Sequence, residues 1–108
     1  MALQHSAAAR LEISLGAIVA NWRILCQHHP GGPVGAVVKA DAYGVGAAKV
    51  APALHEAGCG QFFVALLDEA IAVRDRVPGA MLAVLGGPQP GSEPDYVSTI
   101  QADRSAPW

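Results

Sequence analysis

Charged and aromatic side chains are scarce in this sequence of 108 residues, at 15% and 6% of the chain. The seven basic residues are scattered, and no cluster of them could neutralise several nucleic-acid phosphates. No apolar run approaches the roughly 18 residues that a transmembrane helix needs, and the N-terminus lacks the pattern of a secretion signal. We therefore expect a cytoplasmic protein that binds neither nucleic acid nor membrane.

Cysteine is equally scarce. Cys26 and Cys59 lie far apart, and neither has a His or Cys neighbour at metal-ligand spacing, so neither a metal site nor a disulfide framework is supported. Hydrophobic residues, in contrast, make up 52% of the chain, which is more than enough for a buried core. Because so little charge is available to coat the surface, we expect another subunit or a continuation of the chain to cover part of it.

Two kinds of hydrophobic spacing alternate along the chain. Residues 11–15 alternate with period two, which predicts a short strand. Apolar residues from Ile18 to Cys26 recur at helical spacing, which predicts a helix with Ser14 as its N-cap. The later apolar runs are typical of parallel strands buried on both faces. These strands are predicted at 34–40, 61–67 and 80–85, and the helices between them at 48–57 and 68–77.

The order strand, helix, strand, helix, strand implies right-handed crossovers and a parallel sheet covered by helices, so the fold class is α/β. A closed (β/α)8 barrel typically has about 250 residues, so in that fold this chain would be a part of the barrel. Pro52 is expected near the start of its helix, where a missing N–H costs little. Residues 89–108 show no sustained periodicity and are assigned no element.

Lys39 is one of only two lysines and follows an apolar strand at its carboxyl end. Ligands of α/β proteins bind at that edge of the sheet, and a lysine held in apolar surroundings is a usable nucleophile toward an aldehyde. On position alone, a lysine that ends a strand and extends to solvent is the simpler interpretation. Gly44 and Gly46 could form a phosphate-binding turn, but the third glycine of the dinucleotide fingerprint is replaced by Lys49, and a plain tight turn is at least as good an explanation.

The whole phrase Ala-Val-Val-Lys-Ala-Asp-Ala-Tyr-Gly-Val-Gly, residues 36–46, resembles the cofactor-attachment motif of alanine racemases. Residues 11–21, 63–70 and 82–86 resemble further segments of that family. Two positions depart from its commonest form, Asp41 in place of asparagine and Val45 in place of histidine. The resemblance implies a partial (β/α)8 TIM barrel of the alanine racemase type, with about three βα units present.

The resemblance also implies pyridoxal 5'-phosphate (PLP) as the cofactor and an isomerase that interconverts L-alanine and D-alanine, which supplies peptidoglycan synthesis. Lys39 would bind PLP covalently and act as one of two proton-transfer bases. Tyr43 would contact the cofactor phosphate, and Val37 and Leu85 would line the cofactor. For Tyr43, Val37 and Leu85, ordinary packing is an equally good explanation, and it does not exclude cofactor contact.

In the family the opposite base is a tyrosine from a C-terminal β domain of the partner subunit, so the resemblance implies a homodimer at full length. The chain is accordingly expected to be an N-terminal fragment of the PLP-binding domain, matched over 10–88 and inactive alone, with 98–108 as an aberrant tail. Two alternatives stay open: a racemase for another amino acid such as serine, and a non-catalytic PLP-binding protein of the same fold type.

Overall fold

A parallel sheet of three strands forms the centre of the molecule. The computed structural model describes residues 8–100. Strand β1 (Ala36–Val37) lies beside β2 (Gln61–Val64), which lies beside β3 (Met81–Val84), in the order β1-β2-β3. Ala36 pairs with Phe62, and Phe62 pairs with Leu82. The predicted α/β class with parallel strands is confirmed, although each strand is shorter than its apolar run.

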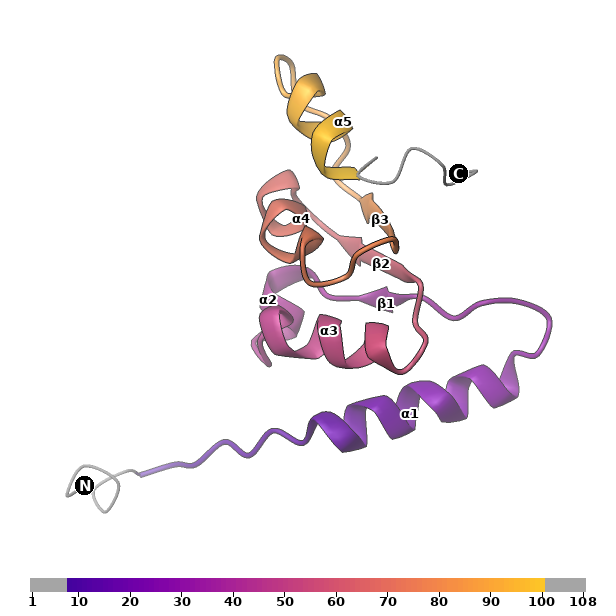
Figure 1. Ribbon diagram of the computed structural model, residues 1–108. Coiled ribbons are helices and arrows are strands. Elements are labelled where there is room, and N and C mark those ends of the chain that lie inside the picture. The colour runs from indigo at the N-terminus through magenta and orange to yellow at the C-terminus, as the bar shows by residue number, and fades with distance from the viewer. Residues whose placement is uncertain (1–7, 101–108) are drawn as a thin grey trace.

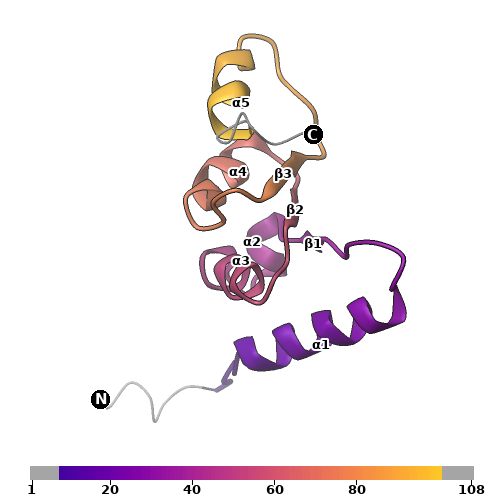
Figure 2. The same cartoon turned by 45° about the vertical axis from the view of Figure 1, so that its right-hand side comes forward.

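Helices α3 (Ala47–Glu56) and α4 (Leu67–Arg74) connect the strands and lie on one side of the sheet, as Figures 1 and 2 show. Phe62, Val64 and Leu82 face these helices and are buried. Phe63, their neighbour in sequence, faces the other way and stays partly exposed. The prediction that these strands are buried on both faces is therefore wrong for residues 8–100, because the helices that follow the strands cover a single face.

Helix α1 (Leu15–His28) packs against α3 at the edge of the molecule (Figure 1). Ser14 is its N-cap as predicted, since its hydroxyl oxygen accepts a hydrogen bond from the N–H of Ala17 at 3.1 Å. The indole N–H of Trp22 donates to the carbonyl of Val34 at 2.9 Å. This bond fixes α1 to the segment that leads into β1.

The strand predicted at residues 11–15 does not form. Leu15 already belongs to α1, and the side chains of Leu11 and Ile13 are exposed. A strand exists only where a neighbouring chain pairs with its N–H and C=O groups. No neighbour lies beside this segment within the described residues, so the period-two pattern has no sheet to join.

Pro52 lies in the interior of α3, not near its start, because the helix begins at Ala47 with Gly46 as its N-cap. Residue 52 therefore cannot donate to the carbonyl of Ala48, its usual partner one turn earlier. The guanidinium of Arg76 donates to that carbonyl instead, with Nη1 3.3 Å from the oxygen. A side chain from the loop after α4 thus replaces the backbone donor.

The loop between α4 and β3 is held by Arg74, which is buried. Its Nη2 donates to the carbonyls of Val77, at 2.6 Å, and Ala80, at 2.8 Å. Burial lowers the pKa of this guanidinium, while the neighbouring carboxylate of Asp75 opposes the shift. Arg74 therefore fixes the path of the chain into β3.

Residues left without an assignment from the sequence form a further helix, α5 (Glu93–Ile100), which packs against α4. Ser92 precedes it: the N–H of Tyr96 donates to the Ser92 carbonyl at 3.0 Å, and the N–H of Gln89 donates to its hydroxyl at 3.0 Å. The predicted tail at 98–108 lies partly in this helix and partly outside the described residues. Within residues 8–100, no helix is long and apolar enough to span a bilayer.

Candidate active site

Lys39 lies at the carboxyl edge of the sheet, directly after β1. The N–H of Val38 donates to the carbonyl of Phe63 at 2.9 Å, so the pairing with β2 continues up to the residue before Lys39. Val38 is buried on the helix side, while the side chain of Lys39 is partly exposed. With a ψ of 25°, Val38 ends the extended conformation, so Lys39 begins the turn at this edge of the sheet.

Helix α2 (Lys39–Tyr43) is mostly a left-handed turn. Ala40, Asp41, Ala42 and Tyr43 have φ angles of 51, 55, 54 and 56°. For residues with a side chain, this conformation costs roughly 1–2 kcal/mol each. Four such residues in succession need contacts from outside the turn to hold them, and the structure supplies these contacts on both sides.

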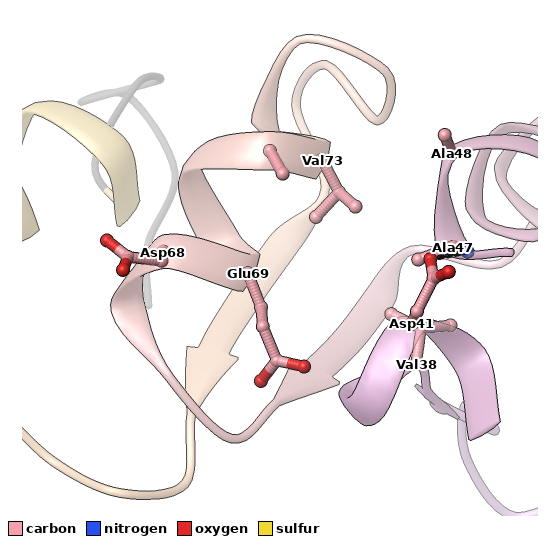
Figure 3. A pocket seen from close by; sticks show the side chains of 8 residues that line it. Val38, Asp41, Ala47, Ala48, Asp68, Glu69 and Val73 are labelled. Carbon is pink, nitrogen blue, oxygen red and sulfur yellow. Dashed lines mark hydrogen bonds between the residues drawn. The ribbon is translucent and has the colours of Figure 1, made fainter. Parts of the chain in front are cut away.

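Asp41 supplies the contacts on the side of α3. Its main-chain oxygen accepts from the N–H of Gly46 at 2.8 Å, and its side-chain Oδ1 accepts from the N–H of Ala47 at 2.8 Å. Figure 3 shows the second of these bonds at the start of α3. Because Ala47 is the first residue of α3, a side chain in the turn caps the next helix.

Glu69 supplies the contact on the side of α4. Its Oε1 accepts from the N–H groups of Ala65 and Leu66, both at 2.9 Å, which satisfies donors at the start of α4. Its Oε2 accepts from the N–H of Ala40 at 2.6 Å. Desolvation raises the pKa of Glu69, but these backbone hydrogen bonds outweigh it and hold the pKa below 4.5. One carboxylate therefore joins the start of α4 to the residue after Lys39.

A hollow of about 290 Å³ lies between Glu69 and Asp41. Figure 3 shows Asp41 at the α2 side and Glu69 reaching in from α4, with the side chains of Val38 and Val73 nearby. Within residues 8–100, no group of three or more His, Cys, Asp or Glu side chains is placed to hold a metal ion.

Val37 and Leu85 lie on the bare face of the sheet. Val37 pairs with Phe63, which pairs with Ala83, and Leu85 follows Ala83 by two residues. The pairing of β3 with β2 continues to Leu85, whose N–H donates to the carbonyl of Val64 at 2.8 Å. Val37 is 46% exposed and Leu85 59% exposed. The structure thus brings Val37 and Leu85 to the bare face near the carboxyl edge of the sheet, where Lys39 begins the turn that follows β1.

Tyr43 ends the left-handed turn and is 65% exposed. It is not packed into the corner between strand and turn, which was the alternative explanation of this residue. Its assignment to a cofactor phosphate stays a prediction, as do the assignments of Lys39, Val37 and Leu85.

The sequence reasoning missed the part played by Asp41 and Glu69 in this site. From the sequence, Asp41 stands out only as a departure from asparagine, while Asp68 and Glu69 suggest only an N-cap and an acid matched to the helix dipole at the start of the helix predicted at 68–77. The cap of α4 is instead Leu66, which offers no side-chain acceptor, and Glu69 reaches back to its N–H. An acidic residue three positions after the end of an extended segment is the signal that points to such a contact.

Comparison with known proteins identifies the family. The family model described as alanine racemase, N-terminal domain, matches residues 13–103. The alanine racemase of Acidiphilium cryptum is 55% identical over 83 residues, which are 77% of this chain and 23% of that protein. The alanine racemase of Methylobacterium nodulans is 52% identical over 96 residues, which are 89% of this chain and 26% of that protein.

Among solved structures, the alanine racemase of Bartonella henselae, crystallised with covalently bound pyridoxal phosphate, matches with a TM-score of 0.76 and 46% identity. The match covers 80% of this chain and 24% of that one. The chain belongs to the alanine racemase N-terminal domain family, and its three strands with their helices are part of that family's (β/α)8 barrel. It spans about a quarter of the length of the relatives it matches.

Proposed function

We propose that this chain is the cofactor-binding part of a PLP-dependent alanine racemase and that Lys39 holds PLP. The observation that carries the proposal is the setting of Lys39: a partly exposed lysine at the carboxyl edge of a parallel sheet, followed by a turn fixed through hydrogen bonds. The Bartonella henselae relative, whose structure contains covalently bound pyridoxal phosphate, supports the same assignment.

The residues around Lys39 fit such a cofactor. PLP has a flat aromatic ring, an aldehyde and a phosphate, so it needs an amine, apolar contact surface and a polar group at the phosphate. Lys39 supplies the amine, the partly exposed Val37 and Leu85 supply apolar surface at the same edge, and the accessible Tyr43 supplies a hydroxyl.

When bound, PLP withdraws electrons from the amino acid attached to it and makes the α-proton acidic. With PLP bound, the amine of Lys39 would serve as the acid–base group that takes up or returns that proton on one face of the substrate. Val37 and Leu85 would supply apolar surface that excludes water from the cofactor, and Tyr43 would supply a hydroxyl for its phosphate. The proton on the opposite face needs a second acid–base group, which we assign to a partner subunit, as the family resemblance implies.

The wider functional assignments follow from the same proposal. The complete enzyme would be a cytoplasmic homodimer with a further β domain, acting on alanine, and residues 10–88 would be the family's barrel part within this chain. Relatives are named both as alanine racemases and as catabolic alanine racemases, for example in Agrobacterium fabrum. Supply of D-alanine for peptidoglycan is the role we propose, and breakdown of alanine is the alternative.

The test of Lys39 is trapping of the cofactor. The chain is mixed with PLP, reduced with borohydride, digested and analysed by peptide mass. We expect the adduct on Lys39, its loss in Lys39→Arg and its persistence in Lys49→Arg. An adduct found only on Lys49, the other lysine of the chain, overturns the assignment. Substrate specificity is tested by comparing the rates at which the complete enzyme racemises alanine and serine.

A further inference from the structure

The backbone next to Lys39 is held from two sides. On one side, the N–H of Val38 donates to the β2 backbone at Phe63. On the other, the N–H of Ala40 donates to Oε2 of Glu69 at 2.6 Å, the shortest of that carboxylate's contacts. Glu69 lies 29 positions away from Ala40 in the sequence and comes from α4. The position of Lys39 therefore depends on a helix in the next βα unit.

The hydrogen bond from Ala40 lies where the chain enters its strained conformation. Ala40 is the first of the four residues with left-handed angles, at φ 51° and ψ 44°. An alanine without an outside contact would relax to the right-handed or extended region, since both cost less. The same bond holds the peptide plane between Lys39 and Ala40, so its loss also frees the ψ angle of Lys39 and the placement of that residue at the end of β1.

We propose that Glu69 is a positioning residue for Lys39: its carboxylate fixes the left-handed turn that directs the lysine amine toward the cofactor aldehyde. This inference rests on the proposed function and adds a residue to it. A carboxylate suits this role because its two oxygens accept hydrogen bonds from different segments. Oε1 takes the two N–H groups at the start of α4, and Oε2 remains for Ala40.

Replacing Glu69 by glutamine tests the role of its second acceptor oxygen without changing the size of the side chain. Glu69→Gln keeps the shape of the side chain but has one acceptor oxygen, so it cannot serve Ala40 and the start of α4 together. Glu69→Asp keeps the charge and the helix-end acceptor but is one methylene shorter. Asp68→Asn is the matched control, because it removes one carboxylate from the same first turn of α4, where Asp68 is exposed and has no hydrogen bond to α2.

The experiment measures two quantities in the 108-residue chain and its variants. The first is hydrogen exchange at the Ala40 amide, compared with exchange at the Met81 and Leu85 amides, which report the sheet. The second is the fraction of Lys39 trapped by borohydride as a function of PLP concentration. In Glu69→Gln and Glu69→Asp we expect faster exchange at Ala40, unchanged exchange in the sheet, and about tenfold weaker trapping at Lys39, as the loss of one charged hydrogen bond predicts.

The inference is overturned if trapping in both Glu69 variants equals that in Asp68→Asn, or if Ala40 exchanges at the same rate in all four proteins. If Glu69→Gln loses protection in the sheet as well, Glu69→Asp decides the comparison. If the unsubstituted chain forms no adduct at Lys39, the proposed function fails, and exchange at Ala40 by itself decides whether Glu69 fixes the turn.

Discussion

Ala40, Asp41, Ala42 and Tyr43 adopt backbone angles that glycine adopts most easily. Two carboxylates stabilise the turn: Asp41, within it, accepts from the N–H of Ala47 in α3, and Glu69, from α4, accepts from the N–H of Ala40. Strain held in this way is typical of functional sites, where the surrounding structure determines a conformation that the local sequence does not prefer. The strain can be measured one residue at a time.

Replacing Ala40 by glycine tests the strain. Glycine takes positive φ without steric cost, although it raises the entropy of the unfolded chain, so we expect Ala40→Gly to increase the free energy of unfolding by up to about 1 kcal/mol. Ala72→Gly is the control, because Ala72 is exposed in the right-handed helix α4. There we expect a loss of about 1 kcal/mol. Urea unfolding measures both, and equal losses at the two positions would contradict the assignment of strain to Ala40.

At the scale of elements, two long side chains connect neighbouring segments. Glu69 connects α4 to the turn after β1, and Arg74 connects the end of α4 to the loop before β3. Both accept or donate several backbone hydrogen bonds with one planar charged group. Each side chain gives a testable prediction, and substitution of a neighbouring residue serves as its control.

The dependence of the free energy of unfolding on pH, below about pH 5, tests the role of Glu69. Its pKa is lower in the folded chain than the ordinary 4.5, so its contribution is fully present above that value and is lost as pH falls through the folded pKa. The difference in free energy of unfolding between the unsubstituted chain and Glu69→Gln should therefore be constant above about pH 5 and shrink below pH 4.5. Urea unfolding at a series of pH values measures it, with Asp68→Asn as the charge control. A difference that grows toward acid pH would have the wrong sign.

Replacing Arg74 by lysine should destabilise the chain. An ammonium is a compact point charge and cannot reproduce the fixed fork of the guanidinium, so we expect Arg74→Lys to lower the free energy of unfolding by about 2 kcal/mol. Arg76→Lys alters an exposed side chain with a single bond of 3.3 Å, and should cost less than about 0.5 kcal/mol. Thermal unfolding of the two variants compares them directly. Similar costs would show that Arg74 does not hold the loop.

At the scale of the whole molecule, the sheet has one face buried beneath helices and one face bare. The adjacent residues Phe62 and Phe63 point to opposite faces, and Phe62 is 0% exposed. We expect Phe62→Ala to cost about 3–5 kcal/mol, as in other well-packed cores, and Phe63→Ala to cost less than half as much. Denaturant unfolding of both variants measures the difference. Equal costs would mean that the bare face is covered when the chain is in solution.

The sequence predicted the sheet well because its strands and helices differ strongly in apolar pattern. The runs at 61–67 and 80–85 and the cap at Ser14 needed no tertiary information. The strand at 11–15 was wrong because pairing depends on a neighbour, which a local pattern cannot show. The left-handed turn could not be predicted, because Ala40 and Ala42 carry no local preference for it and the contacts that hold it come from α3 and α4.

The turn after β1 also bears on the order in which the chain becomes structured during synthesis. Its outside contact from Glu69 connects residues 29 positions apart, so it cannot form while only the first βα unit has left the ribosome. Local contacts such as the Ser14 cap of α1 need no such delay. The turn that follows Lys39 is therefore completed late, after β2 and the first turn of α4 are in place, and a nascent chain passes through a stage in which β1 has been made but the turn beside Lys39 is not yet fixed.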